Sequence, residues 1–378
     1  MIHYNQLKII INMKKLIAVT KSSMPSFEEY CDEIKILWEN RWLSNRGCKH
    51  KEFEKQLQER LGVPYVFLYS NGHVALEVGI DALQLPKGGE VITTPYTHCS
   101  TTHSIVRNGL VPVFCDINDV DYTIDVNQIE QYITDKTVAI MATHVYGVLC
   151  DIDAIDKLAK KYNLKVIYDA AHAFGVTKNG VDVASFGDLV MFSCHATKVF
   201  HTIEGGITVF KEKEPYDIIN SLVNFGFDGP EEVAYISTNA RMNEYEAAMG
   251  ICNLRHFEEE TQKRKKVYDK YVELLSGVDG IKLIAPQEGV TQNYAYMPVF
   301  FDGYKYDRNQ VQEMLQKENI LARKYFYPII PDLACYKEMY SNLEFPISKH
   351  AADTVLALPM YADLAVEDVE KICKIILS

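Results

Sequence analysis

The sequence predicts an α/β protein in which a large domain with a mostly parallel sheet precedes a smaller α+β domain. Between residues 60 and 210, short apolar runs alternate with polar segments of helical length. After Asn239 this alternation ends, and a long helical pattern is followed by fewer strand-like runs. The 378 residues also exceed the length at which a single hydrophobic core keeps growing. These patterns and the length together favour two domains.

Seven apolar runs are predicted to form the strands of the large sheet. They are Tyr65–Leu68, Glu90–Thr94, Val111–Asp116, Thr137–Thr143, Lys165–Asp169, Leu189–Ser193 and Gly206–Phe210. Segments such as Val126–Ile133 and Ile152–Tyr162 separate them and are predicted to be helical. Strands that alternate with helices form βαβ units, so we expect a mostly parallel seven-stranded sheet with helices on both faces.

The second part of the chain begins with a helical pattern at Asn243–Leu275, where apolar residues recur at three- and four-residue spacing. The strand-like runs beyond it are Tyr296–Phe300 and Ile320–Tyr327, and a final helix is predicted at Val366–Leu377. These elements suit a small α+β domain. The predicted divisions are 1–23, an N-terminal extension and first segment, 24–255, the large domain, and 256–378, the small domain.

The composition argues against several classes of function. A net charge of −12 disfavours a nucleic-acid partner, because the chain would repel a polyanion. Nine cysteines without a Cys-x-x-Cys pair give neither a zinc framework nor a disulfide scaffold, and they suit the reducing cytoplasm. The chain has no stretch of about 18 apolar residues and no secretion signal, so neither a membrane span nor export is expected.

An acidic residue ends one of the predicted strands. The run Lys165–Asp169 is followed by Ala-Ala-His172-Ala-Phe-Gly175. Parallel α/β sheets place ligands at the carboxyl ends of their strands, so Asp169 is a candidate cofactor contact. The alternative is a helix N-cap, which favours aspartate at the same place, and this segment alone leaves both interpretations open.

A lysine lies between two predicted strands, in the segment Ser193-Cys-His-Ala-Thr-Lys198, which continues as Val-Phe-His-Thr-Ile-Glu204-Gly-Gly206. Most lysines are exposed on the surface, and that interpretation stays open here. A partly desolvated lysine has a lowered pKa and can attack a carbonyl group to form a Schiff base. His195 and His201 flank Lys198 without a carboxylate or cysteine ligand set, so no metal site is expected.

A phosphate site is predicted at the start of a helix. The segment Ser70-Asn-Gly-His73 lies between the strand that ends at Leu68 and a helix-like segment that begins at Val74. Backbone N–H groups and the helix dipole can hold a phosphate at such a place. The sequence contains neither Gly-x-x-x-x-Gly-Lys-Ser/Thr nor Gly-x-Gly-x-x-Gly, which removes the main support for a kinase, a P-loop NTPase or a dinucleotide-binding protein.

Seven motifs occur in a fixed order along most of the chain. They are Ser70-Asn-Gly-His-Val-Ala-Leu76, Thr94-Pro-Tyr-Thr97, Asp169-Ala-Ala-His-Ala173, Ser193 to Lys198, Glu204-Gly-Gly206, Asn239-Ala-Arg-Met242 and Leu358-Pro-Met-Tyr361. Together, from about Met24 to the C-terminus, they resemble the DegT/StrS family of sugar-nucleotide aminotransferases. The resemblance implies fold type I of the enzymes that use pyridoxal 5′-phosphate (PLP), which is the fold of aspartate aminotransferase.

The resemblance also implies roles for individual residues. Lys198 binds PLP as a Schiff base and afterwards moves protons as an acid and a base. Asp169 pairs with the pyridinium nitrogen, so that the ring can act as an electron sink. His172 lies near the ring and its 3-hydroxyl, and His98 occupies the position at which the family usually stacks an aromatic side chain on the ring.

The phosphate of PLP is implied to contact Ser193 and the backbone around Gly72 and His73. Asn239 would reach the phosphate bound in the neighbouring subunit, which implies a homodimer with shared active sites. His73 replaces the common threonine of the family, so only its backbone contact is inferred. Arg46 also departs from the pattern; it either contacts substrate or lies on the surface, and the surface is favoured.

The runs Tyr168–Gly175 and His195–Gly206 are most similar to the branch of the family that makes dTDP-4-amino-4,6-dideoxyglucose (viosamine). This resemblance implies amino transfer from L-glutamate to C4 of dTDP-4-keto-6-deoxy-D-glucose, in the cytoplasm and in the biosynthesis of O-antigen or another polysaccharide. The run Tyr325-Phe-Tyr-Pro328 is a candidate aromatic wall for the sugar, with Tyr325 and Tyr327 as the candidate contacts, and these aromatic residues fit the hydrophobic core equally well.

Three alternative functions are considered. An aminotransferase that acts at C3 of a dTDP-3-keto-6-deoxyhexose fits the same motifs. A sugar dehydratase that uses PLP or its amine form has a histidine in place of Lys198, so the lysine disfavours this activity. A non-catalytic protein on the same fold is disfavoured because it would leave Lys198, Asp169 and Ser193 without a reason to occur together.

Overall fold

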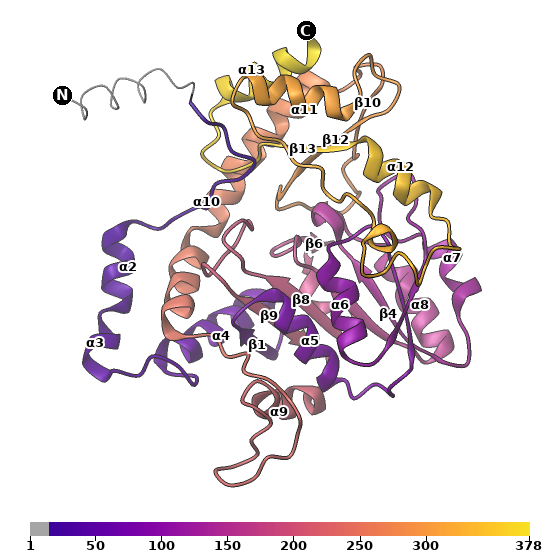
Figure 1. Ribbon diagram of the computed structural model, residues 1–378. Helices are drawn as coiled ribbons and strands as arrows, with labels where there is room; N and C mark the ends of the chain where they lie inside the picture. The colour runs from indigo at the N-terminus through magenta and orange to yellow at the C-terminus, as the bar shows by residue number, and fades with distance from the viewer. Residues whose placement is uncertain (1–14) are drawn as a thin grey trace, which may run out of the picture.

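The computed structural model describes residues 15–378 (Figure 1). A large lobe contains the central sheet, and the C-terminal part of the chain forms a smaller lobe above it in this view. The predicted N-terminal extension falls partly on residues 1–14, which lie outside the described residues. Within residues 15–378, no helix combines the length and the apolar character that a membrane crossing requires.

The central sheet has seven strands, as the apolar runs predict, and it is mostly parallel. Its order is β1 (Tyr65–Tyr69), β9 (Gly206–Phe210), β8 (Leu189–Ser193), β5 (Lys165–Asp169), β4 (Thr137–Thr143), β2 (Glu90–Thr93) and β3 (Val111–Phe114). β9 runs antiparallel to both neighbours, β1 and β8, whereas all pairs from β8 to β3 are parallel. Four predicted runs have the observed bounds, and the other three differ by one or two residues at one end.

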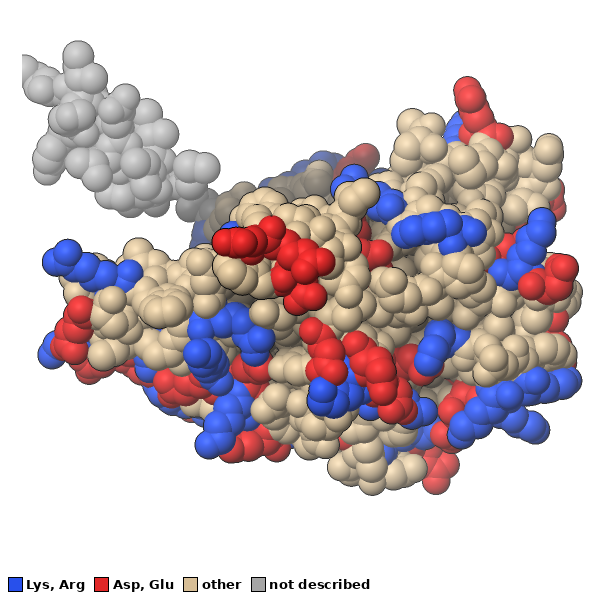
Figure 2. Space-filling view, turned by 90° about the horizontal axis from the view of Figure 1, so that it is seen from below, with Lys and Arg blue, Asp and Glu red and all other residues tan. Residues whose placement is uncertain are grey.

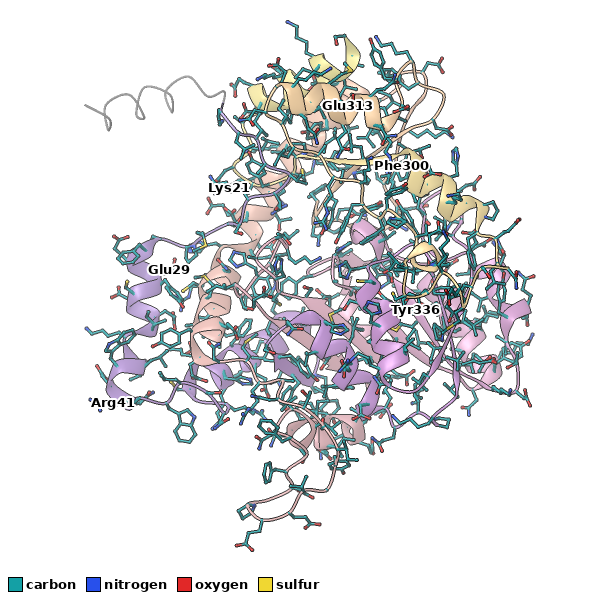
Figure 3. The ribbon with its side chains drawn as sticks, in the orientation of Figure 1. Lys21, Glu29, Arg41, Phe300, Glu313 and Tyr336 are labelled. Carbon is teal, nitrogen blue, oxygen red and sulfur yellow. The ribbon has the colours of Figure 1, made fainter. Side chains whose placement is uncertain are left out.

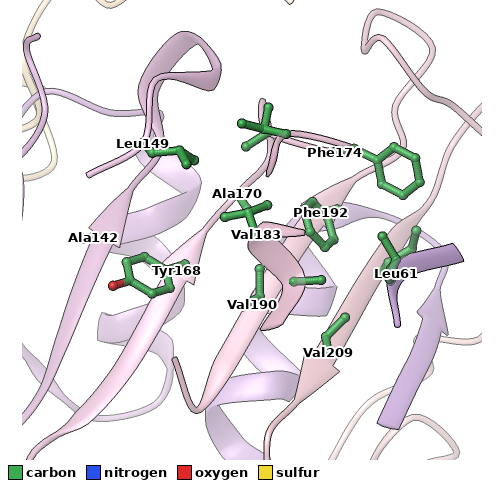
Figure 4. Packing of buried hydrophobic residues seen from close by; sticks show 14 of the residues in the cluster. Leu61, Ala142, Leu149, Tyr168, Ala170, Phe174, Val183, Val190, Phe192 and Val209 are labelled. Carbon is green, nitrogen blue, oxygen red and sulfur yellow. The ribbon is translucent and has the colours of Figure 1, made fainter. Parts of the chain in front are cut away.

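Helices cover both faces of the sheet. One face packs against α5 (Gly72–Ala82), α6 (Cys99–Arg107) and α9 (Lys213–Leu222). The other face packs against α4 (Cys48–Leu61), α8 (Ile152–Tyr162) and the first half of α10 (Glu244–Leu275). Successive strand residues are therefore buried on opposite faces; in β5, Ile167 packs on the first face and Tyr168 on the second. Figure 4 shows Tyr168 in the second core with Val190, Phe192 and Leu61.

Short elements complete the large lobe. They are α2 (Phe27–Ile34), α3 (Ile36–Asn40), α7 (Val126–Ile129), 3₁₀ turns at Glu130–Tyr132, Val145–Gly147 and Val183–Ser185, and a ribbon of β11 (Val290–Thr291), β6 (Thr177–Lys178) and β7 (Val181–Asp182). The predicted helix Val126–Ile133 is α-helical only over α7. α2 and α3 lie at the edge of the molecule (Figure 1), where Arg255 of α10 pairs with Glu29 and Glu33 of α2.

The small lobe is built on a three-stranded antiparallel sheet. Its elements are β10 (Ile281–Leu283), β12 (Met297–Phe301), β13 (Val355–Leu358), α11 (Arg308–Lys317), α12 (Pro346–Thr354), α13 (Val366–Leu377) and a 3₁₀ turn at Ile330–Asp332. The predicted strand Tyr296–Phe300 corresponds to β12, and the predicted final helix corresponds to α13. Ile17 joins the core of this lobe through a bridge to Ile320.

The strand predicted at Ile320–Tyr327 is wrong. Only Ile320 and Arg323 form isolated bridges, and the rest of the segment is irregular. Leu321 and Tyr327 are exposed, but its other apolar residues are buried. Tyr325 and Phe326 pack into a core that lies between the lobes, and Ile320 and Ala322 pack into the small-lobe core. The apolar run therefore predicted the burial of part of the segment, and this burial comes from packing in two cores and not from strand pairing.

Two features join the lobes. The first is the core between them, which contains Tyr146 of the large lobe together with Phe300 and Tyr336, both labelled in Figure 3. The second is α10, in which Phe257 belongs to the large-lobe core and Val267 to the small-lobe core. The boundary predicted between residues 255 and 256 falls inside this helix and stays a prediction.

The end of the molecule that carries α9 is seen in Figure 2. Acidic and basic side chains are interspersed there among large uncharged areas. The loop that follows α9 exposes several large apolar side chains, namely Phe225, Phe227, Val233 and Ile236. The side chains of Trp38, in α3, and of Trp42, just after α3, are also exposed.

Candidate active site

A cavity of about 340 Å³ opens at the carboxyl ends of β4, β5 and β8, facing the small lobe. Thr143, Asp169 and Ser193 line it from the ends of these three strands. The small lobe supplies part of the opposite wall through Arg323 and Tyr325. Parallel α/β sheets bind their ligands at this edge, so the cavity lies where the sequence pattern places a site.

Most residues predicted for the site line this cavity. They are Gly72, His73, His98, Asp169, His172, Ser193, Lys198 and Tyr325. Asn239 and Tyr327 do not line it. Asn239 is exposed, and its side-chain oxygen accepts a hydrogen bond from Arg241 (2.9 Å). Tyr327 is half-exposed with the Arg308 guanidinium 4.2 Å from its ring centre, so the segment turns Tyr325 inward and Tyr327 outward.

The start of α5 forms one wall of the cavity. Asn71 caps the helix by accepting the N–H of Val74 (2.9 Å), which leaves the N–H groups of Gly72 and His73 without intrahelical partners. Gly72 lies so close to Ser193 that a Cβ atom at Gly72 would be 2.9 Å from the Ser193 Cβ. Backbone N–H groups at a helix N-terminus, with a hydroxyl beside them, can bind a phosphate.

The side chains of His73 and Arg46 are held by neighbours. His73 Nδ1 lies 2.7 Å from the Ser100 hydroxyl, and Nε2 lies 3.7 Å from the Glu77 carboxylate. Burial lowers the pKa of His73. Arg46 donates two hydrogen bonds of 2.9 Å to Glu54 and does not line the cavity. Arg46 is therefore partly buried in an ion pair outside the cavity and is not fully exposed on the surface.

Asp169 is buried at the end of β5, and its carboxylate is held from two sides. Oδ2 accepts a hydrogen bond from the Thr101 hydroxyl (2.7 Å), and Oδ1 accepts one from the Ala171 N–H (3.1 Å). Residues 170–175 form turns and no helix begins there, so the N-cap interpretation is wrong. The structure instead presents a fixed carboxylate to the cavity.

Lys198 lies on the loop that joins β8 to β9. Its backbone N–H donates to the His195 carbonyl (2.9 Å), and its side chain lines the cavity. The amine donates a hydrogen bond to the Tyr296 hydroxyl, with 3.4 Å between the two atoms. Burial raises the pKa of Tyr296 to about 12, so its hydroxyl keeps its proton near neutral pH. Lys198 is therefore partly buried in the cavity and is not an ordinary surface lysine.

His172 presents a neutral imidazole to the cavity. Its Nδ1 accepts the N–H of Tyr146 (3.0 Å), so the proton of the neutral ring is on Nε2. Burial, reinforced by the charge of Lys198, lowers the pKa of His172 well below its usual value. The ring lies parallel to Phe326, with 5.8 Å between the ring centres. Nε2 can therefore donate a hydrogen bond to a ligand.

Three residues that contact or line this site were missed by the sequence analysis: Thr101, Tyr296 and Arg323. Thr101 reaches Asp169 from a helix 68 residues earlier in the chain. Tyr296 precedes β12, and Arg323 belongs to the segment wrongly predicted as a strand. Their contacts arise when distant elements pack together, so no local spacing marks them. One sequence feature could have pointed to Arg323, because it is a charged residue, next to Lys324, in the otherwise apolar run Ile320–Tyr327.

The sequence profile of the DegT/DnrJ/EryC1/StrS aminotransferase family matches residues 26–377. The chain belongs to this family. The match covers both lobes and every residue that lines the cavity, so the resemblance carried by the sequence motifs is confirmed.

Curated relatives in the DegT/DnrJ/EryC1/StrS family include three sugar-nucleotide transaminases. The dTDP-4-amino-4,6-dideoxy-D-glucose transaminases of Shigella dysenteriae and Escherichia coli are both 41% identical to this chain, over 95% and 96% of it and 98% and 99% of their own lengths. The dTDP-3-amino-3,6-dideoxy-alpha-D-galactopyranose transaminase of Aneurinibacillus thermoaerophilus is 31% identical, over 86% of this chain and 88% of its own.

Solved structures share the whole fold. DesI, determined in the presence of its TDP-sugar product, has a TM-score of 0.90 at 29% identity, covering 96% of this chain and 93% of DesI. The PLP form of the putative sugar aminotransferase Spr1654 from Streptococcus pneumoniae has a TM-score of 0.87 at 25% identity, covering 95% of this chain and 97% of that protein. The chain is therefore a PLP-dependent sugar aminotransferase of fold type I.

Proposed function

We propose that this enzyme transfers the amino group of L-glutamate to C4 of dTDP-4-keto-6-deoxy-D-glucose and so forms dTDP-4-amino-4,6-dideoxy-D-glucose. The relatives support this substrate, because both transaminases named for that 4-amino sugar are 41% identical to the chain. The relative named for a 3-amino sugar is only 31% identical. This difference favours amination at C4 over the C3 alternative.

The groups around the cavity fit PLP. We assign the phosphate to the N–H groups of Gly72 and His73 and to the Ser193 hydroxyl. The closeness of Gly72 and Ser193 supports this assignment, because any side chain at Gly72 would fill the space between the start of α5 and the Ser193 hydroxyl. We assign the pyridine nitrogen to Asp169, whose buried carboxylate is positioned to stabilise a protonated ring nitrogen.

When bound, PLP supplies an electron sink that allows an amino group to move from donor to acceptor. Lys198 attaches the cofactor, and its released amine moves protons to and from the carbon that carries the nitrogen. Tyr296 accepts a hydrogen bond from this amine and so holds it in place. We assign His98 to the face of the cofactor ring and His172, through Nε2, to its 3-hydroxyl.

The sugar is assigned to the wall formed by Tyr325 and Phe326. Both side chains are buried and line the cavity. A 6-deoxy sugar presents a methyl group and an uncharged ring, which suit an aromatic surface with few charges. Tyr146 donates a hydrogen bond to the Tyr325 carbonyl, and this contact fixes the wall against the large lobe.

We propose a cytoplasmic homodimer that serves the biosynthesis of O-antigen or another polysaccharide. Asn239 is exposed outside its own cavity, and we assign it to the phosphate site of a second subunit. The neighbouring loop exposes Phe225, Val233 and Ile236, and clustered exposed apolar residues commonly mark an interface. All nine cysteines are free, which suits a reducing compartment.

The direct test is to incubate the enzyme with PLP, L-glutamate and a panel of keto-sugar nucleotides and to determine the products by NMR. We expect dTDP-4-keto-6-deoxy-D-glucose to be aminated at C4 while glutamate becomes 2-oxoglutarate. If that compound stays unchanged and the dTDP-3-keto-6-deoxy isomer is converted, the C4 assignment is wrong and the C3 alternative stands.

Lys198→Ala should abolish the yellow absorbance of the holoenzyme and multiple turnover, because the amine that attaches the cofactor and moves protons is gone. PLP or its amine form should still bind noncovalently. The measurements are the absorption spectrum and the product formed per enzyme. Lys211→Ala, at an exposed lysine just after β9, is the matched control and should behave as the wild type. Wild-type turnover in Lys198→Ala would remove Lys198 from the mechanism.

A further inference from the structure

Three threonine hydroxyls form a chain of hydrogen bonds that leads to Asp169. Thr143 Oγ1 lies 3.0 Å from Thr97 Oγ1, which lies 2.8 Å from Thr101 Oγ1. The Thr101 hydroxyl then donates to Asp169 Oδ2 (2.7 Å). Thr143 and Asp169 end β4 and β5, Thr101 belongs to α6, and Thr97 lies two residues before that helix. The chain therefore exists only because these elements pack together.

The whole chain is buried, and none of its four residues is more than 5% exposed. Thr97 and Thr143 line the active-site cavity, whereas Thr101 lies behind its wall. Thr143 and Asp169 are partners in the register of the two neighbouring strands, so the chain runs from the end of one strand to the end of the next. Hydrogen bonds are stronger in such a setting than in water, because the local dielectric constant is low.

The bond to Asp169 fixes the direction of the other two hydrogen bonds. A hydroxyl has one proton to donate, and Thr101 gives its proton to the carboxylate, so Thr101 must accept the proton of Thr97. Thr97 then has no proton left and must accept the proton of Thr143. All three protons therefore point toward Asp169. Hydrogen bonds aligned in this way polarise one another, which strengthens each by about 10–30%.

The position of one proton depends on how well the Asp169 carboxylate is supported. When Asp169 faces the ring nitrogen of PLP, the shared proton is either on the nitrogen, which gives an ion pair, or on the carboxyl group, which gives a neutral pair. Burial costs the ion pair more than the neutral pair, so the two arrangements come close in energy. Hydrogen bonds donated to the ionised carboxylate favour the ion pair. Asp169 accepts such bonds from Thr101 and from the Ala171 N–H.

We propose that Thr143 and Thr97, acting through Thr101, hold the shared proton on the ring nitrogen of the cofactor and keep it off Asp169. The inference rests on the proposed function in one respect, namely the assignment of the ring nitrogen to Asp169. A ring without this proton is a weaker electron sink, so amino transfer depends on the chain. The three threonines are positioning residues, because they act through the carboxylate.

The test measures the NMR chemical shift of the ring nitrogen in isotopically labelled PLP bound to the enzyme, because this shift differs between a protonated and an unprotonated ring. Thr101→Val, Thr97→Val and Thr143→Val each remove one hydroxyl, and Thr101→Ser keeps it. Thr102→Val is the matched control, because Thr102 is the adjacent residue on α6, is fully buried, and has a hydroxyl without a partner in the part of the chain that the structure describes.

We expect Thr101→Val to move the balance at least about tenfold toward the unprotonated ring, the usual effect of losing a hydrogen bond to a charged group. Thr97→Val should move it by up to about fivefold, because only the polarisation of the Thr101 bond is lost, and Thr143→Val should move it less. Thr101→Ser and Thr102→Val should keep the wild-type shift. In turnover assays kcat should fall in the same order, while the KM for the sugar nucleotide stays unchanged.

Asp169→Asn separates this inference from the assignment on which it rests. If Asp169→Asn changes the shift but Thr101→Val and Thr97→Val do not, the inference is overturned and the pairing of Asp169 with the ring nitrogen stands. If Asp169→Asn leaves the wild-type shift, or if the wild-type ring is unprotonated, the pairing itself is wrong and the inference falls with it. Should Thr101→Val fail to fold, Thr97→Val decides alone, because it keeps the bond to Asp169. The product assay with glutamate tests the reaction separately.

Discussion

Thr101 and Thr102 are neighbours on α6 and are both fully buried, but only one of them has a hydrogen-bond partner. The Thr101 hydroxyl donates to Asp169 and lies 2.8 Å from the Thr97 hydroxyl, whereas the Thr102 hydroxyl has no partner within the described part of the chain. A hydrogen bond to a buried carboxylate stabilises the fold, while an unpaired buried hydroxyl contributes nothing comparable. The pair therefore separates the effect of supporting Asp169 from the effect of losing a buried hydroxyl.

Thr101→Val should lower the free energy of unfolding of the cofactor-free enzyme by about 1.5–3 kcal/mol, because it removes a hydrogen bond to a charged group. Thr102→Val should be neutral or slightly stabilising, because it removes a hydroxyl that is already unpaired. Urea unfolding followed by circular dichroism measures both. Equal losses in the two variants would mean that the bond from Thr101 to Asp169 does not stabilise the fold.

At the scale of elements, the phosphate site proposed at Gly72, His73 and Ser193 depends on how closely α5 approaches β8. A Cβ atom at Gly72 would lie 2.9 Å from the Ser193 Cβ and 3.1 Å from its hydroxyl oxygen, which is too close for a side chain without movement. Ser193 belongs to a central strand of the sheet, so it cannot shift easily. A side chain at Gly72 must therefore displace the start of the helix and its N–H groups.

Gly72→Ala should weaken PLP binding at least about tenfold, equal to about 1.4 kcal/mol, and should also destabilise the cofactor-free fold. Equilibrium dialysis and urea unfolding measure the two effects. In Gly72→Ala/Ser193→Gly the crowding is removed, so we expect the stability to recover, whereas PLP binding stays weak without the serine hydroxyl. Normal PLP affinity in Gly72→Ala would contradict the assignment of the phosphate to this site.

The elements show which parts of the molecule the sequence could predict. The strands of the large sheet follow from local apolar runs, because most residues of such a strand are buried on one face or the other. The same rule failed at Ile320–Tyr327, where Tyr325 and Phe326 are buried against the other lobe without pairing in a sheet. Lys198 and Asp169 were found because they lie beside predicted strands. Tyr296 and Arg323 were not, because only the packing of the two lobes brings them to the cavity.

At the scale of the whole molecule, several buried histidines make stability depend on pH. Burial lowers the pKa of His50 and of His144 to about 3, and it lowers the pKa of His172 well below its usual value. These rings stay neutral in the folded chain, while the unfolded chain takes up protons below about pH 6.5. The unfolded state then binds more protons, so these groups lower the free energy of unfolding as the pH falls below that value.

His144→Asn should isolate one of these contributions, because His144 is fully buried and the amide oxygen can still accept the Cys150 N–H. Between pH 6.5 and 5, we expect the free energy of unfolding of the variant to fall less steeply than that of the wild type, by a difference that approaches about 1.4 kcal/mol per pH unit near pH 5. Other titrating groups are common to both proteins and cancel in the difference. Identical slopes for His144→Asn and the wild type would show that His144 does not contribute.

The proposed shared sites predict complementation between inactive subunits. Lys198→Ala lacks the reactive amine in its own cavity, and Asn239→Ala lacks the contact offered to the partner. Mixed dimers should contain one complete site, so co-expression should restore activity that neither variant shows alone. The measurement is the specific activity of the purified mixed dimer. A fully active monomer in sedimentation would contradict the shared sites.

The continuity of α10 has a mechanical consequence for how substrates enter. Its 32 residues extend for about 48 Å, with one half embedded in the large-lobe core and the other in the small-lobe core. Helices bend sharply mainly at proline or at local irregularities, and this helix contains no proline. A large rotation of one lobe away from the other would therefore require α10, which belongs to both lobes, to bend sharply or unfold locally. We expect substrates to exchange through local rearrangement of the segment that carries Arg323 and Phe326, while the angle between the lobes stays nearly constant.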